Sequence, residues 1–563
     1  MSPKSFRAQR EYSRHIFGQF LEQFHRTVYG GIFEPGSPHS DERGFRLDVL
    51  DALRELKVPN VRWPGGCFVS SYHWLDGVGP DRSPVYSPAW RVVDPNTFGT
   101  DEFLAWCEDL GADPYFCTNA GTGTAEEMAH WLEYTNRPVG SRWSNLRAEN
   151  GHEDPYGVPF WSIGNENYGV WEIGQKTGET WAPLVAEAAK YLRRIDENIE
   201  ILAAAVDEPG WMLPLLEQAG GFLNYVSIHG YWDDIPFINN PSPYLACMGR
   251  TPEPEQRIAN ARALIDASGQ HHVKIAFDEW NLRAWHTPPG SSEASIGARD
   301  LNDINATYTM ADAVFSAVFL NSCVRNGDVV GMANLAPAVN VRGPLYVHPE
   351  GVVKRTTFHV MAMYANLLGP RVIDSAISSA NLDTGSVDVP LVDAVVTGDD
   401  DDHVIVALVN KSDSRAGGVR VRIGGVPVKG GTERSSSPAP RPTPITTSRV
   451  QMRSTRSRPS STSSMGSPRS PLTAWSSARS TVPRRASRMA SHGRGVRLGC
   501  GPRRRAADEP TETRRSCSRC TSCGSSAGLG VNCVRTGCPL RSGRRIPDAH
   551  AAGTDTPTCQ DEV

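Results

Sequence analysis

Two glutamates that each end an apolar run have the residue type and the setting for acid–base and nucleophilic chemistry. Glu166 follows Asn165 in the stretch W-S-I-G-N-E-N-Y-G (residues 161–169), and Glu279 follows Asp278 in K-I-A-F-D-E. A carboxyl at the end of a buried strand is partly desolvated, which raises its pKa and can keep it protonated near neutral pH. A second carboxyl that is hydrogen-bonded by its neighbours stays ionised and can attack carbon.

This division of roles is found in retaining glycoside hydrolysis, which needs the two carboxyls roughly 5–5.5 Å apart. For either glutamate alone, a solvated loop carboxylate is an equal alternative. Two glutamates at the ends of strands that face each other make that alternative weak. A barrel that only binds carbohydrate needs stacking aromatic residues but no paired acids, so the pair favours an enzyme. The inactive product of a disrupted gene is the remaining alternative from another class.

The elements that must position these glutamates are short β-rich runs that alternate with amphipathic helical segments. Strands are expected at residues 16–20, 59–63, 113–119, 158–166, 199–207, 224–229, 273–279 and 329–334. Helices are expected at residues 42–56, 100–110, 124–135, 180–196, 210–219, 252–268, 301–326 and 353–368. Eight strand–helix units of this kind predict an α/β protein with a (β/α)8 TIM barrel.

A doubly wound open sheet would show the same alternation, so the residues at the strand ends have to separate the two folds. A barrel gathers all its carboxyl ends around one mouth, whereas an open sheet spreads them along an edge. The eight expected strands all finish on or just before polar residues, which favours the barrel: Glu22, Arg62, Asn119, Asn165 with Glu166, Asp207, His229, Glu279 and Asn334.

The chain divides into four regions by composition. Residues 1–15 form a lead-in that could join a later β-sheet, and residues 16–369 form the catalytic barrel. Residues 370–430 change to alternating β sequence (V-I-D-S-A-I, V-D-A-V-V-T, H-V-I-V-A-L-V-N and V-R-V-R-I) and predict a partial β-sandwich domain. Within it, D-D-D-D at residues 399–402 is interpreted as a solvated hairpin turn, with a calcium site as the alternative.

Residues 431–563 have the composition of a disordered or frame-shifted tail. They contain 23 Arg, no Lys and 8 acidic residues, a net charge of +15, which leaves 35 basic and 54 acidic residues, or −19, in the rest of the chain. An out-of-frame translation of GC-rich DNA would give this mixture of Arg, Ser, Pro and Cys, and would leave the sandwich incomplete. A zinc site at C-S-R-C-T-S-C (residues 517–523) is the weaker alternative, because no second Cys or His pair stands at the usual spacing.

The acidic body excludes nucleic acid and an anionic membrane as partners. No run approaches the roughly 18 apolar residues of a membrane helix, and the N-terminus shows no secretory signal, so a cytoplasmic protein is expected. The sequence shows no metal set and no phosphate-binding loop, and no cofactor is expected. Seven aromatic residues near the expected mouth are candidates for stacking on sugar rings: Trp63, Tyr72, Trp74, Trp90, Trp171, Trp232 and Trp285.

From residue 16 to residue 368, the ordered motifs resemble the α-L-arabinofuranosidases of glycoside hydrolase family 51, in clan A. The resemblance rests on F-G-Q-F-L-E-Q-F-H-R-T-V-Y-G-G-I-F-E-P-G, V-R-W-P-G-G-C-F-V-S-S-Y-H-W-L-D-G-V-G-P, F-G-T-D-E-F, W-S-I-G-N-E-N-Y-G, S-I-H-G-Y, F-D-E-W-N and V-K-R-T-T-F-H-V. G-N-E alone is shared across the clan, whereas R-W-P-G-G and V-Y-G-G-I together are more specific. Other retaining hydrolases of the clan, β-glycanases or β-xylosidases, are the nearest alternatives.

The resemblance implies a role for each candidate residue. Glu166 would be the general acid/base and Glu279 the nucleophile, and the product would be arabinose released from the non-reducing ends of arabinose-containing oligosaccharides. Asn165 would hold the sugar 2-hydroxyl. The remaining substrate-binding residues would be Glu22, Arg62, Cys67, His229 and Tyr231, although a structural ion pair for Arg62 and a supporting role for His229 are alternatives.

Two departures from the family pattern affect the sugar pocket and its rim. Cys67 follows P-G-G, where better-known members of the family carry asparagine, so one sugar contact changes in kind. Pro337 stands where the resemblance predicts a glutamine that contacts the substrate, so substrate preference is less secure than mechanism. The family also packs a complete β-sandwich beside its barrel and often forms oligomers. A homo-oligomer, a hexamer by resemblance, is therefore an expectation for this chain.

Overall fold

The computed structural model describes residues 9–24, 26–233, 242–284, 308–399, 403–414, 432–436 and 446–451. Four expectations lie outside these residues: the strand at 419–423, the Cys-rich run at 517–523, the stacking residue Trp285 and most of the D-D-D-D turn. At that turn, Asp399 is described, and its Oδ1 accepts a hydrogen bond from the backbone N–H of His403 at 2.9 Å.

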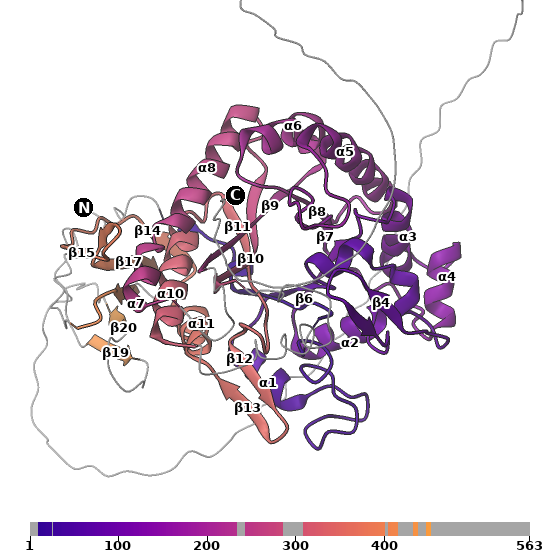
Figure 1. Cartoon of the computed structure of the whole chain (residues 1–563), viewed down its shortest axis with the longest axis horizontal. Helices are drawn as coiled ribbons and strands as arrows, with labels where there is room; N and C mark the ends of the chain where they lie inside the picture. Colours follow the sequence, from indigo (N-terminus) through magenta and orange to yellow (C-terminus); the bar gives the residue numbers. More distant parts are fainter. Residues whose placement is uncertain are drawn as a thin grey trace, which may run out of the picture. The chain divides into compact units, whose positions relative to one another are not determined.

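Eight parallel strands form a closed barrel in sequence order (Figure 1). Each strand pairs with the next along the chain, and the last pairs with the first through Asn334 and Gly18, which closes the ring. The (β/α)8 barrel is thereby confirmed, and the open sheet is excluded. The strands are β2 (Gly18–Phe20), β3 (Asn60–Trp63), β6 (Asp113–Thr118), β7 (Phe160–Ile163), β8 (Glu200–Ala204), β9 (Tyr225–Asp233), β10 (Lys274–Arg283) and β11 (Val330–Leu335).

Helices surround this barrel (Figure 1), and each expected helix is present. The end of helix α2 could be predicted from the sequence because a glycine, Gly111, follows it. Gly111 has the left-handed conformation, at φ 76°, that glycine adopts without strain. The expected helices are α1 (Leu47–Glu55), α2 (Thr100–Leu110), α3 (Ala125–Asn136), α5 (Gly178–Ile195), α6 (Pro209–Ala219), α8 (Glu253–Ser268), α10 (Met310–Arg325) and α11 (Thr356–Leu367).

Two short helices, α4 (Arg142–Glu149) and α7 (Tyr244–Gly249), were not predicted. Helix α4 has no apolar stripe, because polar Ser144 and Arg147 accompany Trp143 on its buried side. The buried Arg147 instead donates hydrogen bonds to backbone carbonyls, including those of Tyr134 and Glu153. Because the buried guanidinium rather than a row of apolar side chains stabilises this helix, the sequence shows no apolar residues at helical spacing there.

A second, six-stranded sheet has the order β1-β14-β17-β18-β20-β19. Its first strand, β1 (Gln9–Glu11), comes from the lead-in and pairs antiparallel with β14 (Arg371–Ile373). Its last two strands come from beyond residue 430, in the region that the sequence assigns to the tail, and β20 pairs with β18. The other strands are β17 (Val392–Gly398), β18 (His403–Asn410), β19 (Thr432–Ser436) and β20 (Thr446–Gln451).

Three short hairpins complete the described strands. They are β4 (Val85–Ser87) with β5 (Val92–Asp94), β12 (Leu345–His348) with β13 (Gly351–Lys354), and β15 (Asn381–Asp383) with β16 (Asp388–Pro390).

Helix α10 joins the barrel to the six-stranded sheet. It contacts β10 and β11 on one side and β17 and β18 on the other, and it is buried from Ala311 to Val324. This placement explains why the helix is apolar on nearly all sides. Polar contacts lie at its end, where Asp393 of β17 accepts hydrogen bonds from Asn321 Nδ2 at 2.6 Å and Arg325 at 2.9 Å.

We expect Asp393→Ala to lower the free energy of unfolding by about 1–2 kcal/mol, because it leaves two partly buried donors without their acceptor. The measurement is urea denaturation followed by circular dichroism. Asp374→Ala is the matched control, since Asp374 is an exposed aspartate beside the same sheet whose ion pair with Arg10 is 3.3 Å long. Exposed pairs contribute little. Equal midpoints for the two variants would show that the α10 contact does not stabilise the fold.

Candidate active site

All eight predicted site residues lie on the carboxyl side of the barrel strands. Three follow strands directly: Glu22 after β2, and Asn165 with Glu166 after β7. Four lie within strands: Arg62 in β3, His229 and Tyr231 in β9, and Glu279 in β10. Cys67 begins the short 3-10 helix η2 (Cys67–Ser71) that follows β3. Six of these residues are joined by the hydrogen bonds and ion pairs described below.

Glu279 is oriented by two donors. Arg62 pairs with its Oε1, and the hydroxyl of Tyr231 donates to its Oε2 at 2.8 Å. The side chain of Glu279 is only 3% exposed. A buried carboxyl with a guanidinium and a phenol as partners has a fixed orientation, as a nucleophile requires.

Arg62 connects the two glutamate strands. Its NH2 group donates to Asn165 Oδ1 at 2.7 Å, and its Nε lies 3.3 Å from Asp278 Oδ2. Burial raises the pKa of Asp278, but the charge of Arg62 and the contact with His229 outweigh it and hold the pKa at about 2. The ion-pair role that the sequence left open for Arg62 is therefore present, and it is directed to Glu279 and Asp278.

Glu166 lies in a strained turn and accepts three hydrogen bonds. Its φ is +43°, a left-handed conformation that is uncommon for a residue with a side chain and is often found at functional sites. His229 Nδ1 contacts its Oε1 at 2.8 Å, Trp171 Nε1 donates to Oε2 at 2.8 Å, and Tyr168 donates to Oε1 at 3.4 Å.

The expectation that desolvation keeps Glu166 protonated is wrong for this structure. Burial raises the pKa of Glu166, but the hydrogen bond and charge of His229 and the bond from Trp171 outweigh it, so the pKa lies below its ordinary value. The free enzyme therefore holds Glu166 as a carboxylate. The proton between the two side chains belongs mainly to His229.

His229 is surrounded by carboxylates. Its Nδ1 lies 3.7 Å from Glu279 Oε2 in addition to its contact with Glu166, and its Nε2 lies 3.6 Å from Asp278 Oδ1. Burial lowers the pKa of His229, but the charge of Glu279 and the contacts with Asp278 and Glu166 raise it to about 10. The imidazole is therefore an imidazolium at neutral pH.

We expect the stability that His229 contributes to depend on pH. Its pKa is about 10 in the folded protein and roughly 6.5 in the unfolded chain, so the folded state binds the proton more tightly. The contribution is complete below roughly pH 6.5 and is lost as the pH rises through about 10. Urea midpoints of the parent and His229→Gln should therefore converge as the pH rises over this range. A constant difference would contradict a charged His229.

One carboxylate oxygen of Glu166 and one of Glu279 lie within 4.8 Å of one another, together with a ring nitrogen of His229. This separation is close to the roughly 5–5.5 Å of retaining glycosidases and well below the roughly 6.5–9.5 Å that inverting enzymes need for a water molecule. The arrangement can therefore support attack by one carboxylate and proton transfer by the other.

Glu22 occupies the adjoining side of the site. Its Oε1 accepts hydrogen bonds from the backbone N–H of Phe68 at 2.9 Å and from Trp90 Nε1 at 2.8 Å. Burial and the charge of Glu279 raise the pKa of Glu22 well above its ordinary value. A Cβ on Gly65 would lie 2.5 Å from Glu22 Cγ, which explains why P-G-G precedes Cys67.

Two residues of the loop after β7 differ from the predictions made from the sequence. Glu172 was not predicted as a site residue, and Trp171 was predicted only to stack on a sugar. Glu172 is buried beside Cys67, and its Oε1 accepts a hydrogen bond from Ser70. Burial and the charges of Glu166 and Glu279 raise the pKa of Glu172 to about 7, against the hydrogen bonds from Cys67 and Ser70. Trp171 was a candidate only for stacking, and it also bonds Glu166. Neither residue stands at the end of an apolar run, so the rule that identified the other site residues did not identify these two.

The candidate stacking residues differ in exposure. Trp171 is 61% exposed, whereas the other described ones are packed in the core and cannot present a face to a sugar: Trp63, Tyr72, Trp74, Trp90 and Trp232. Trp285 lies outside the described residues. Pro337, after β11, is the residue that stands in place of the expected glutamine, and no side-chain amide is available at that position.

Comparison with known proteins gives two consecutive family matches. Residues 52–247 match the α-L-arabinofuranosidase 1 domain, and residues 278–489 match the α-L-arabinofuranosidase C-terminal domain. The GH51 α-L-arabinofuranosidase of Thermotoga petrophila is 35% identical, with a TM-score of 0.67 over 74% of this chain and 86% of that chain. The chain belongs to glycoside hydrolase family 51, the α-L-arabinofuranosidases. The second match continues past residue 430, as strands β19 and β20 do.

Other α-L-arabinofuranosidases are similar to this chain over a comparable length. α-L-Arabinofuranosidase C of Emericella nidulans is 37% identical over 73% of this chain and 84% of that protein. The intracellular exo-α-(1→5)-L-arabinofuranosidase of Halalkalibacterium halodurans is 34% identical over 72% of this chain and 83% of that protein. The arabinose complex of the Thermotoga maritima α-L-arabinofuranosidase has a TM-score of 0.67 at 34% identity, over 76% of this chain and 87% of that chain.

Two further properties of this family 51 chain concern membranes and metal ions. In the part of the chain that the structure describes, no helix has both the length and the apolarity needed to cross a bilayer. Two groups of side chains among the described residues place potential metal-ligating atoms together. One is Glu166, His229 and Glu279, and the other is Cys67, Glu166 and Glu172.

Proposed function

We propose that this chain removes terminal non-reducing α-L-arabinofuranosyl residues by double displacement, with Glu279 as nucleophile and Glu166 as general acid/base. The observation that supports double displacement is the pair of carboxylate oxygens within 4.8 Å, and the roles rest on the different partners of the two glutamates. Glu279 is paired with Arg62 and accepts a hydrogen bond from Tyr231, which fix the direction of its carboxyl. Glu166 has an imidazolium as its hydrogen-bond partner, which can exchange a proton with it.

In the first step, a Glu279 oxygen attacks the anomeric carbon while the bond to the leaving oxygen breaks and Glu166 protonates that oxygen. Because Glu166 is ionised in the free enzyme, it must first receive a proton, and His229 Nδ1 at 2.8 Å is placed to supply it. In the second step, Glu166 removes a proton from water, which attacks the glycosyl ester and releases Glu279. The ionised form that the free enzyme favours is the form this second step needs.

The sugar contacts follow from buried polar atoms that lack partners. Among the described residues, Asn165 Nδ2 and Glu22 Oε2 are buried without a hydrogen bond. Such groups are costly unless a ligand or water satisfies them. We assign Asn165 Nδ2 to the sugar 2-hydroxyl, because Arg62 already fixes its Oδ1. Glu22 Oε2 is assigned to a further hydroxyl, with Tyr231 and Cys67 at the sides.

The substrate class is tested by comparing turnover of aryl α-L-arabinofuranoside, aryl β-D-xyloside and aryl β-D-glucoside. We expect the arabinofuranoside to have the highest kcat/KM and proton NMR to show the α-anomer as the first product. A better xyloside or glucoside would favour the β-xylosidase or β-glycanase alternative. No turnover of any substrate by folded protein would favour the inactive product of a disrupted gene.

The natural substrate that we propose is a short arabinose-containing oligosaccharide in the cytoplasm. The name of the Halalkalibacterium halodurans relative, an intracellular exo-α-(1→5) enzyme, supports both parts of this proposal. Hydrolysis of arabinotriose from its non-reducing end, followed by chromatography, tests the mode of action. Light scattering of the purified chain tests the expected homo-oligomer.

A further inference from the structure

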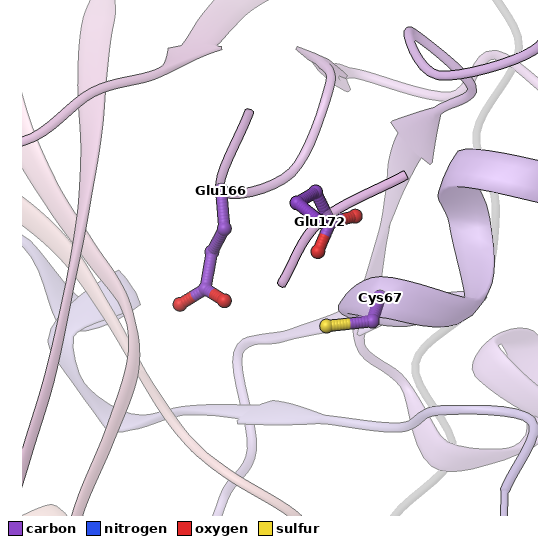
Figure 2. Close-up of side chains that lie close together, drawn as sticks. All are labelled: Cys67, Glu166 and Glu172. Atoms are coloured by element: carbon purple, nitrogen blue, oxygen red, sulfur yellow. The ribbon is translucent and has the colours of Figure 1, made fainter. Parts of the chain in front are cut away.

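We propose that Cys67, Glu166 and Glu172 form a binding site for one soft divalent cation of the Zn²⁺ or Cd²⁺ class. One thiol sulfur and one oxygen from each carboxylate all lie within 4.8 Å of one another. Figure 2 shows the three side chains directed toward one space, Cys67 from the start of η2 and both glutamates from the loop after β7. The inference that a bound cation stops hydrolysis rests on the proposed function of Glu166.

The carboxyl of Glu172 points to a ligand independently of the clustering. This side chain is 4% exposed, and Ser70 donates to its Oε1. Its Oε2 is buried without a hydrogen bond of normal geometry among the described residues. The Cys67 thiol interacts with this carboxyl, but a thiol is a weak donor. A cation shared by the thiolate and the carboxylate would satisfy the Oε2 oxygen that the protein leaves without a strong partner.

The ligand types select the class of cation. Zn²⁺ accepts thiolate and carboxylate ligands and is stable with three protein ligands and one open position, whereas Mg²⁺ and Ca²⁺ need six or more oxygens. The cation takes the place of the thiol proton, which is released to solvent, and no electron is transferred.

A cation at this site would compete with catalysis rather than assist it. A carboxylate oxygen of Glu166 would coordinate the cation, so Glu166 could not protonate the leaving oxygen. The other ligand group, Glu166, His229 and Glu279, is a weaker candidate, because His229 and Glu279 already have hydrogen-bond partners, whereas Glu172 Oε2 is buried without one in the described part of the chain. Only the proposed site contains Cys67 and Glu172, so substitutions of these two residues test which of the two sites binds the cation.

The direct test is titration of the full chain with CdCl₂, followed by the ultraviolet charge-transfer band of a cadmium thiolate. The variants are Cys67→Ala and Glu172→Gln, and Cys107→Ala is the matched control, because Cys107 is buried in α2 outside the site. The seven cysteines beyond residue 499 are present in every variant, so binding is obtained by difference from the parent. We expect Cys67→Ala to lose one equivalent of the band, Glu172→Gln to weaken that equivalent by about 10–100-fold, and Cys107→Ala to match the parent.

The proposal is overturned if Cys67→Ala retains the full band and affinity of the parent. Glu172→Gln keeps the size of the side chain and an acceptor for Ser70, so it serves as a second variant if Cys67→Ala does not fold. As a second readout, Zn²⁺ should inhibit hydrolysis by the parent, reversibly on addition of a chelator, with an inhibition constant at least about tenfold higher for Glu172→Gln.

The failure of this inference and the failure of the proposed function are distinguishable. If the parent hydrolyses no arabinofuranoside, the proposed function fails, but the cadmium titration still decides whether the site exists. If the parent is active and Zn²⁺ inhibits the parent and Glu172→Gln equally, the cation acts elsewhere, and the site is rejected while the function stands.

Discussion

Glu279→Ala should reduce kcat for an aryl α-L-arabinofuranoside on the order of 10⁴-fold or more, because no covalent intermediate can form without the attacking carboxylate. The loss should be similar for substrates with good and poor leaving groups, since the nucleophile acts on both. Added azide can occupy the space of the missing carboxylate and attack the anomeric carbon. The measurement is the anomeric configuration of the arabinosyl azide, which we expect to be β, inverted from the substrate.

Glu279→Gln is the matched control for this prediction. It keeps the shape of the side chain and an acceptor for Tyr231 but removes the negative charge that pairs with Arg62. We expect it to be as inactive as the alanine variant and not to be rescued by azide. Near-ultraviolet circular dichroism checks that both variants are folded. Activity within tenfold of the parent in either variant would remove Glu279 from the role of nucleophile.

For Glu166→Ala, the loss should depend on the leaving group, which distinguishes an acid/base residue from a nucleophile. With an alkyl or sugar leaving group, we expect kcat/KM to fall about 10²–10⁴-fold, because the departing oxygen receives no proton. With a dinitrophenyl leaving group, kcat/KM should change little, whereas kcat should fall because water is no longer activated. Added azide should restore kcat and give the α-azide, with retained configuration.

The control for Glu166 is His229→Gln, which removes the proton donor but leaves the carboxyl in place. We expect it to fall between the parent and Glu166→Ala for the sugar leaving group and to show no azide product. If the losses in Glu166→Ala were equal for all leaving groups, Glu166 would not be the acid. An α-azide from the Glu279 variant would show that the two roles are exchanged.

The barrel and most of its site could be predicted from the sequence because their signals are local. The rule that a strand ends where an apolar run meets a polar residue marks both glutamates: Glu166 follows β7, whereas β10 continues past Glu279 to Arg283. Arg62 and His229 follow by the same rule, since the parallel strands of a barrel place their carboxyl ends around one mouth. A short separation of the two carboxyls was inferred from the chemistry of retaining hydrolysis. In the structure, one oxygen of Glu166 and one of Glu279 lie within 4.8 Å of one another.

What could not be predicted depends on contacts between distant residues. The pKa of Glu166 is lowered by His229, which is 63 residues away along the chain, and by Trp171, whose indole direction is set by a loop. Glu172 lies within that loop, where neither apolar periodicity nor a strand end marks it. Helix α4 depends on hydrogen bonds from the buried Arg147 rather than on apolar spacing.

The closing pair of the barrel has a consequence for synthesis of the protein. Strand β2 is synthesised well before its second neighbour, β11, which ends only at Leu335. Until then one side of β2 carries unpaired backbone groups, which makes a nascent barrel prone to strand exchange and aggregation. The same delay applies to β1, whose partner β14 begins at Arg371. The two early strands must therefore avoid pairing with other strand edges until both late partners have been made.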